Sequence, residues 1–560
     1  MTMKKSFPKY KKPSSIPIVN RQWPANELTV APKWCSVDLR DGNQSLPIPM
    51  GPAIKLDYFN LLVDIGFKEI EVGFPSASQD DFDFCRKLIE ENLIPEDVTI
   101  SVLVQARKHL IDRTVEALKG VKKGIIHCYV ATSDLHGKFV FGRERDEVIK
   151  MAVEGTQLVV DALERENMRD VINYEFSPEE FTDTDIDFAI ELSKKVKEVW
   201  GECKKDEFIL NLPATVERRP PNQYADMIEY FCRNYPYLDQ TTISVHAHND
   251  QGCAVAASEL SLLAGAERVE GTLFGHGERT GNVDIVTLAM NMFSRGIDPK
   301  LDFSNIDNVI KIVEEASNIM VHPRHPYAGS LVYTAFSGSH QDAIRKGMEL
   351  REEISEFFEQ NWKVPYLHID PADVGRKYGK LIRINAQSGK GGVVYILEND
   401  FDIYPPKKMH PAIGGVVQKV AEEKNNELST QDIYDAFETE FVDVAGDYQL
   451  LEYKRMPEEE ADIVKVSLKM AIKGEKFDVV GNGNGPVSAM VAAIKTLDFI
   501  KSFVLVDFSE QTLGTDANAV AMAYMGVEVD GVLHYGAGRH ENIDKAAVRA
   551  LFSALNRIEK

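Results

Sequence analysis

Two histidines, His246 and His248, stand one residue apart at the end of a short β-branched run, residues 242–245. Side chains at positions i and i+2 of a strand point to the same side, so both imidazoles face one surface. Two neutral imidazoles completed by a carboxylate form a suitable ligand set for a divalent metal. The pair alone is a weak signal, because most single histidines are structural residues. Its weight depends on which other groups the fold brings to the same surface.

A guanidinium and a carboxylate, Arg40 and Asp41, follow another short apolar run, residues 34–38, and are followed in turn by a glycine and two amides. Asp41 is the best third metal ligand. Arg40 is always charged and donates several hydrogen bonds, so it suits a substrate carboxylate or an oxyanion that develops on a carbonyl. The alternative is an ion pair that only shapes a turn. The neighbouring glycine and amides argue against that interpretation.

Further polar groups stand within or just after other apolar runs. The loop 275–282 is rich in glycine, which lets the backbone approach a ligand closely, and its Asn282 offers one more oxygen ligand. The other candidates, in chain order, are Glu71, His127, Glu175, Glu179, Thr215 and Glu217. Polar side chains associated with so many separate runs indicate one shared site.

Short apolar runs of this kind alternate with helix-length amphipathic stretches over the first three hundred residues, and this alternation predicts a parallel sheet. The predicted strands are residues 34–38, 68–72, 98–102, 125–129, 171–175, 208–212, 242–245 and 268–273. The clearest predicted helices between them are 54–65, 146–164, 186–200 and 253–264. Eight repeats favour a closed (β/α)8 TIM barrel over an open sheet, and no GxGxxG motif follows the first strand. In a barrel the loops after the strands converge on one face, where the polar groups must then lie.

The second half of the chain has a different pattern. After residue 301 it is mainly helical, with predicted helices at 305–317 and 341–360 and a glycine-rich connector at 388–392. From about residue 443 two β-rich halves follow, each ending in a glycine-bearing turn and a helix, at 487–497 and 543–558. This weak repeat predicts an α+β unit. We expect four parts, namely an N-terminal arm (1–30), a catalytic barrel (31–325), helical and linker subdomains (326–442) and a C-terminal domain (443–560).

The composition excludes several classes of partner. Lys and Arg number 64 against 87 Asp and Glu, and the net charge of -23 repels nucleic acid and anionic lipid. No apolar run approaches the roughly 20 residues that span a bilayer, and the first residues lack an apolar signal core. The six cysteines are widely spaced without a CxxC motif, which favours reduced thiols. We therefore expect a soluble cytoplasmic protein that binds neither nucleic acid nor a membrane.

The motifs LRDGNQ, IEVGFP, HAHND and GHGERTGN occur in this order, at 39–44, 70–75, 246–250 and 275–282. Together they resemble the metal-dependent barrel family that contains isopropylmalate, homocitrate and citramalate synthases and related acyl-CoA lyases. The segments NRQWP (20–24), YTAFSGSHQDAI (333–344) and GNGNGP (481–486) narrow the resemblance to the longer bacterial isopropylmalate synthases. The resemblance covers nearly the whole chain, and the combination of motifs is specific although each motif alone is not.

This resemblance implies a Claisen-type condensation of acetyl-CoA with 2-oxoisovalerate, which gives 2-isopropylmalate and CoA in the first committed step of leucine biosynthesis. It also implies a divalent metal, Mg, Mn or Zn, as cofactor. The implied ligands are Asp41, His246 and His248, with Asn282 nearby. The residues implied to bind the oxo acid are Arg40, Glu71, His127 and Thr215.

The same resemblance implies the acid/base groups and the regulation. Glu179 and His340 match the family's acid/base pair, and His340 is implied to reach the site from the neighbouring subunit of a homodimer. The C-terminal domain is implied to bind leucine as a feedback inhibitor, with Asn484, Gly485 and Pro486 as effector-binding residues.

Three alternatives remain open from the residues themselves. The nearest is a citramalate or homocitrate synthase, because the metal site does not distinguish the oxo acid. A lyase would run the same carbon-carbon chemistry in reverse, and the predicted regulatory domain argues against it. A non-catalytic amino-acid sensor would not need the polar groups at the barrel mouth, all of which are present.

Overall fold

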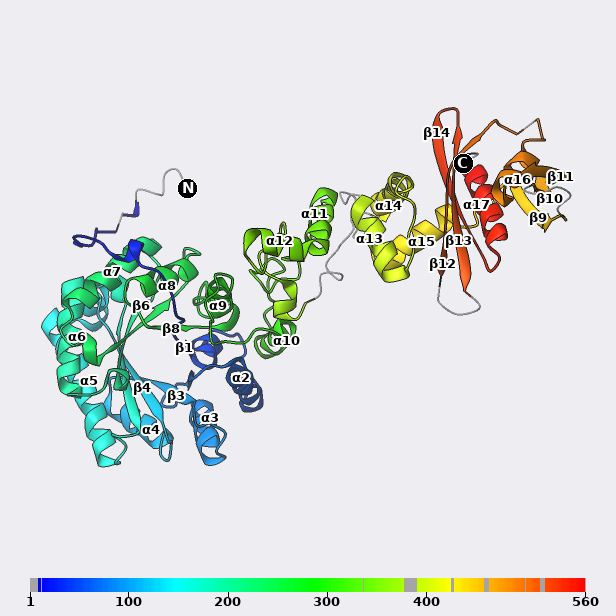
Figure 1. Cartoon of the computed structure of the whole chain (residues 1–560). Helices are drawn as coiled ribbons and strands as arrows, with labels where there is room; N and C mark the ends of the chain where they lie inside the picture. The colour runs from blue at the N-terminus through cyan, green and yellow to red at the C-terminus, as the bar shows by residue number, and fades with distance from the viewer. Residues whose placement is uncertain are drawn as a thin grey trace. The chain divides into compact units, whose positions relative to one another are not determined.

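The computed structural model describes residues 9–11, 13–335, 337–376, 390–424, 428–457, 463–498, 500–513 and 519–558. The chain forms two compact units (Figure 1), the first from residues 1–332 with 372–375 and the second from residues 333–371 with 376–560. None of the described helices combines the length and the hydropathy that a membrane crossing requires.

Eight parallel strands of the first unit close into a barrel in chain order, with β8 pairing back onto β1. They are β1 (Lys33–Ser36), β2 (Glu69–Gly73), β3 (Thr99–Gln105), β4 (Gly124–Ala131), β5 (Ile172–Glu179), β6 (Phe208–Ala214), β7 (Thr242–Ala247) and β8 (Arg268–Gly271). Each barrel strand has helices on its outer face and packed side chains on its inner face, so both faces are buried. Every residue of β6 is buried. The predicted TIM barrel is confirmed, and each predicted strand overlaps an observed one.

Helices follow the barrel strands along the chain and cover the barrel (Figure 1). They are α2 (Pro52–Ile65), α3 (Gln79–Glu90), α4 (Lys108–Ala117), α5 (Arg145–Arg165), α6 (Ile186–Trp200), α7 (Pro221–Asn234), α8 (Ala254–Leu263), α9 (Ile285–Phe293) and α10 (Ile306–Ser317). Local sequence sets their ends. Asp185 caps α6 by accepting the Phe188 N–H, and Gly66 ends α2 in the left-handed conformation, at φ 114°.

The second unit begins with helices. They are α11 (Gly338–Glu349), α12 (Arg351–Phe358), α13 (Lys390–Phe401), α14 (His410–Lys424) and α15 (Thr430–Phe441). The prediction of one continuous helix over 341–360 was wrong, because Leu350 leaves the helical conformation (φ -97°, ψ 18°) and separates α11 from α12. Two residues of the predicted connector, 388 and 389, lie outside the described residues.

Two three-stranded antiparallel sheets complete the second unit. The first contains β9 (Tyr448–Arg455), β10 (Val464–Ile472) and β11 (Glu475–Gly483) and is followed by α16 (Pro486–Ile494). The second contains β12 (Val504–Leu513), β13 (Val520–Val529) and β14 (Val532–His540) and is followed by α17 (Ile543–Ile558). The predicted α+β repeat, in which each β-rich half ends in a helix, is confirmed.

Glycines explain why the two halves share a pattern. A Cβ at Gly481 on β11 would lie 2.3 Å from the carbonyl oxygen of Ala489 on α16, and one at Gly536 on β14 would lie 2.2 Å from the Ala554 nitrogen on α17. Each helix therefore rests directly on the strand before it, which only glycine permits. These glycines of the repeat serve helix packing.

The arm before the barrel is held by two acidic residues of α7. Arg21 donates to Asp226 through Nε (2.5 Å) and Nη2 (2.6 Å), and the buried indole of Trp23 donates to the same carboxylate at 2.8 Å. Glu229 accepts the backbone N–H groups of Gln22 and Trp23, the latter at 3.0 Å. The NRQWP motif is thus a docking segment for α7.

We predict that Asp226→Ala releases the arm, because it leaves the buried Trp23 N–H unpaired at a cost of about 1–3 kcal/mol. Limited trypsin digestion should then cleave after Arg21 faster than in the unaltered chain. Asn234→Ala is the control, since it removes only an exposed bond to the Tyr230 carbonyl on the same helix. Equal cleavage rates in both variants would show that Asp226 does not anchor the arm.

Candidate active site

A cavity of about 180 Å³ opens at the carboxyl ends of the barrel strands. Its lining comes from the strand ends and the loops after them, as the barrel geometry requires. The lining residues are Arg40, Asp41, Gln44, Phe74, Leu103, His127, Tyr129, Ser177, Glu179, Asn211, Pro213, Thr215, His246, His248, Glu278 and Arg279. The expected concentration of polar groups on this face is therefore present.

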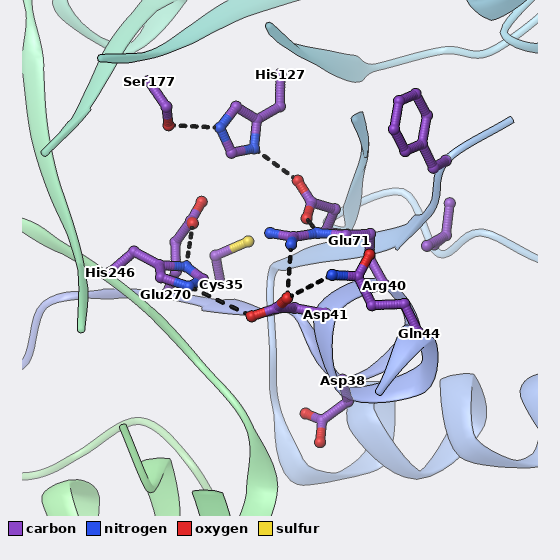
Figure 2. A network of polar contacts seen from close by, with 12 residues as sticks. Cys35, Asp38, Arg40, Asp41, Gln44, Glu71, His127, Ser177, His246 and Glu270 are labelled. Atoms are coloured by element: carbon purple, nitrogen blue, oxygen red, sulfur yellow. Dashed lines mark hydrogen bonds and ion pairs between the residues drawn. The ribbon is translucent and has the colours of Figure 1, made fainter. Parts of the chain in front are cut away.

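The π-helical turn η3 (Asp38–Gly42) follows β1 and presents Arg40 and Asp41 to the cavity. Asp38 on the same turn points away from them (Figure 2) and accepts hydrogen bonds from the Tyr58 hydroxyl (2.8 Å) and the Leu273 N–H (3.0 Å). Burial raises the pKa of Asp38 to about 7 despite these hydrogen bonds. Asp38 ties the turn to α2 and to the segment after β8, which holds Asp41 in place.

Asp41, His246 and His248 form a compact group whose ligand atoms all lie within 4.8 Å of one another. Oδ2 of Asp41 lies 3.4 Å from Nε2 of His246 and 3.7 Å from Nε2 of His248. This oxygen is buried and receives no hydrogen bond from any described residue. A buried carboxylate oxygen that lies near two imidazole nitrogens and receives no hydrogen bond fits a divalent metal.

Electrostatics in this group depend on burial and on neighbouring charge. Burial alone would raise the pKa of Asp41, but the charge of Arg40 and the contact with His246 hold it below its ordinary range. Burial and the neighbouring His246 lower the pKa of His248 to about 4, which leaves a neutral imidazole. Against burial, the hydrogen bond to Glu270 and the nearby Asp41 carboxylate raise the pKa of His246 to about 9. The imidazole of His246 is therefore more basic than that of His248.

A closed ring of polar contacts surrounds the base of the cavity, and Figure 2 shows most of it. In order, it runs through Arg40, Glu71, His127, Ser177, Asn211, Glu270, His246 and Asp41, which contacts Arg40 again. The His127 ring joins the Glu71 carboxylate and the Ser177 hydroxyl, both at 2.7 Å. Arg40 Nη1 lies 3.0 Å from Asp41 Oδ1. We call this set the polar ring.

Most residues that the sequence singled out in the barrel come together. Thr215 lines the cavity and accepts the Glu180 N–H at 2.9 Å. Asn282 pairs with His248 through a backbone bridge, and its Oδ1 is buried without a hydrogen bond from the described residues. Glu71 is fully buried and does not line the cavity, because its carboxylate binds Arg40 and His127.

Strand β5 carries two of the candidates, Glu175 and Glu179, with Ser177 at the alternate position between them. Glu175, Ser177 and Glu179 share one face of the strand, with Ser177 and Glu179 in the cavity lining and Glu175 fully buried. Glu175 contacts Arg268, at 3.0 Å. Glu217 accepts the Gln251 N–H at 2.5 Å and orders the loop after β7.

The remaining predicted residues belong to the second unit. His340 on α11 is exposed, and its ring stacks on Tyr366 with centroids 4.0 Å apart. Asn484 accepts the Ser488 hydroxyl at 2.7 Å, Gly485 caps α16 and Pro486 is its first residue.

Sequence reasoning missed several groups of the site. Asn211 is the one polar residue of an otherwise apolar strand, and this interruption was an available signal. Ser177 and Glu270 stand in strands with other polar residues, so they gave no such signal. Gln44 donates to Asp41 at 2.9 Å and stands in the same motif as Arg40. Tyr129 is at the inward position next after His127 on β4, but apolar runs with aromatic residues are common in any core.

Three family models match the chain. The model described as HMGL-like matches residues 31–313. The model described as alpha-isopropylmalate synthase, post-catalytic domain-like, matches residues 330–398. The LeuA allosteric (dimerisation) domain matches residues 427–559. The matches follow the order of barrel, helices and α+β repeat.

Curated relatives match almost end to end. A 2-isopropylmalate synthase of Clostridium acetobutylicum is 47% identical and is aligned over 98% of this chain and 99% of its own length. A 2-isopropylmalate synthase of Rhodospirillum rubrum is 46% identical over 98% of both chains. The chain belongs to the 2-isopropylmalate synthase family. A further family member, from Thermobifida fusca, is 47% identical over 99% of this chain and 98% of its own. The prediction of a transferase enzyme of this family is confirmed.

Membership in the 2-isopropylmalate synthase family implies a divalent metal. We predict that Asp41→Asn weakens Mn²⁺ binding by about a hundredfold or more. This loss exceeds the one that is typical when a residue only orients a metal ligand. The measurement is a Mn²⁺ titration of the metal-free protein, followed by the EPR signal of free Mn²⁺. Asp183→Asn is the control, because its carboxylate contacts Arg218, at 3.2 Å. Unchanged Mn²⁺ affinity in Asp41→Asn would remove Asp41 from the metal site.

Proposed function

We propose that the chain condenses acetyl-CoA with 2-oxoisovalerate (3-methyl-2-oxobutanoate) and hydrolyses the thioester, giving 2-isopropylmalate and CoA. The observation that carries the proposal is the meeting of three groups in one cavity, namely the Asp41-His246-His248 group, Arg40 and Glu179. The reaction needs a group that polarises the ketone, a group that stabilises the negative charge that develops on its oxygen, and a base that removes a proton from a weakly acidic methyl group. The names of the curated relatives support the choice of substrates.

The oxo acid is placed against Arg40 and Thr215, with His127 beside them and Glu71 holding the guanidinium from behind. A divalent metal, when bound by Asp41, His246 and His248, supplies a Lewis acid that polarises the ketone. Two imidazoles and one carboxylate suit Zn and Mn, and Mg is selected where availability decides. Arg40 stabilises the negative charge that develops on the ketone oxygen during carbon-carbon bond formation.

Glu179 is the proposed base. Burial raises the pKa of Glu179, with His136 and Arg40 opposing the shift, so the carboxylate is a better proton acceptor than an exposed glutamate. It removes a methyl proton from acetyl-CoA, and the resulting carbanion attacks the ketone carbon. Water then cleaves the thioester and releases CoA. We assign His340 to the delivery of a proton to the alkoxide oxygen that the attack creates, because its motif matches the second member of the acid/base pair.

The second unit is proposed to regulate the enzyme. The LeuA allosteric (dimerisation) domain supports leucine as the feedback inhibitor and a homodimer as the assembly. Asn484, Gly485 and Pro486 stand at the N-terminus of α16, where the helix dipole favours a carboxylate. We retain the division into an arm, a barrel, a helical linker and a C-terminal regulatory domain, with boundaries near residues 30, 325 and 442. The six free thiols favour a cytoplasmic location.

We predict that 2-oxoisovalerate is preferred over pyruvate and 2-oxoglutarate by at least about tenfold in kcat/KM, the scale set by one or two methyl groups in an apolar pocket. CoA release from acetyl-CoA, followed with a thiol reagent, measures each rate. Adding leucine to the same assay should lower the rate. Preference for pyruvate or 2-oxoglutarate would instead assign the chain to the citramalate or homocitrate synthases.

The acid limb of the pH profile should belong to Glu179. Because its pKa is raised, the ionised base is lost as pH falls, and the limb should lie above the range of an ordinary glutamate. Glu179→Gln should lower kcat by about 10²- to 10⁴-fold and remove this limb. Glu164→Gln is the control, since Glu164 is an exposed residue of α5 and does not line the cavity. A Glu179→Gln profile with an unchanged limb would exclude Glu179 as the base.

A further inference from the structure

One buried carboxylate next to the metal group has no part in the proposed reaction. Glu270 on β8 is fully buried and is the register partner of His246 on β7. Its Oε2 lies 2.9 Å from His246 Nδ1 and accepts a hydrogen bond from Asn211 Nδ2 at 3.0 Å. Its Oε1 accepts from Arg268 at 2.8 Å. Both oxygens are therefore occupied, each by a different element of the barrel.

Arg268 holds Glu270 in place. This guanidinium is also fully buried, and it donates to both oxygens of Glu175 (3.0 and 3.1 Å) and to the hydroxyl of Ser244 (2.8 Å). Its Nε donates to Glu69 at 2.6 Å. A planar guanidinium with this many fixed partners can adopt only one orientation. The Glu270 carboxylate that it binds is therefore fixed in orientation as well.

The contact with Glu270 decides which nitrogen of His246 carries a proton. A carboxylate paired with a guanidinium only accepts hydrogen bonds, so Nδ1 of His246 must donate. In the neutral imidazole the lone pair then lies on Nε2, the nitrogen that faces Asp41 at 3.4 Å. A metal ligand needs this lone pair, and partners that fix the tautomer of a ligand typically change metal affinity.

We propose that Glu270 is a positioning residue of the metal site, which fixes the Nδ1–H tautomer of His246 and is itself oriented by Arg268. The inference rests on the metal group Asp41-His246-His248 proposed above. Glu270 does not touch the substrates or the metal. Its effect passes through the His246 ring.

Glu270→Gln tests this role because glutamine offers one acceptor and one donor where glutamate offers two acceptors. Arg268 has no acceptor, so the amide oxygen must face it and the amide NH₂ must face His246. Nδ1 then has to accept, and the proton moves to Nε2, where it blocks the lone pair. A similar loss of the correct tautomer, with geometry intact, is known from the Asp-to-Asn change in serine-protease triads.

The experiment measures Mn²⁺ binding to the metal-free full-length chain by EPR titration. We expect Glu270→Gln to raise the Mn²⁺ dissociation constant by about 10- to 100-fold. Glu69→Gln is the matched control. It also removes one of the carboxylate charges that face Arg268, but Glu69 contacts only the Nε of Arg268 and does not contact His246. It should bind Mn²⁺ like the unaltered chain. At saturating Mn²⁺, kcat of Glu270→Gln should return towards the unaltered value while the Mn²⁺ concentration for half-activation stays raised.

The outcomes separate the inference from the function on which it rests. If the unaltered chain itself binds no Mn²⁺, the metal site fails. If it binds Mn²⁺ and Glu270→Gln binds equally well, or Glu69→Gln is weakened as much, the positioning role is overturned and the metal site stands. If Glu270→Gln does not fold, Glu270→Asp is the second variant. It keeps a negative carboxylate beside Arg268, but the shorter side chain moves that carboxylate away from His246. It should also bind Mn²⁺ more weakly, and unchanged binding would overturn the inference.

Discussion

The polar ring defined above is the constraint on which the rest of the barrel depends. It joins η3 to β2, β4, β5, β6, β7 and β8, so its eight side chains reach one another only when the sheet is closed in register. A buried polar group without a partner costs about 1–3 kcal/mol, and a displaced strand would leave several such groups at once. The ring therefore links the geometry of the site to the closure of the fold.

Charged groups inside the barrel are held in pairs. Arg40 contacts Asp41 and the fully buried Glu71, and the fully buried Arg268 contacts Glu175 and Glu270. Burial raises the pKa of Glu175, so its carboxyl adds less negative charge than the others. A buried charge is tolerated in a region of low dielectric only when a partner compensates it. The proposed metal would add a partner for the Asp41 oxygen that receives no hydrogen bond from the described residues.

The second unit follows a different rule. Its two halves depend on backbone contact between a helix and a strand, which Gly481 and Gly536 permit. Its α17 contributes a continuous buried face to the core, with Leu551 and Leu555 fully or almost fully buried.

The sequence by itself determined the alternation of strands and helices and the barrel, because period-2 and period-3.6 patterns are local. It also placed two imidazoles on one face through the HxH spacing. It also indicated Arg40 and Asp41, which adjoin each other in the chain. Only the tertiary structure decided that Glu71 contacts Arg40 and that Glu270 contacts His246. The second contact depends on the register between β7 and β8, which the sequence of neither strand determines alone. The break at Leu350 was likewise invisible, because helical periodicity continues across it. Contacts between distant segments depend on closure of the barrel, and closure is a property of all eight strands together.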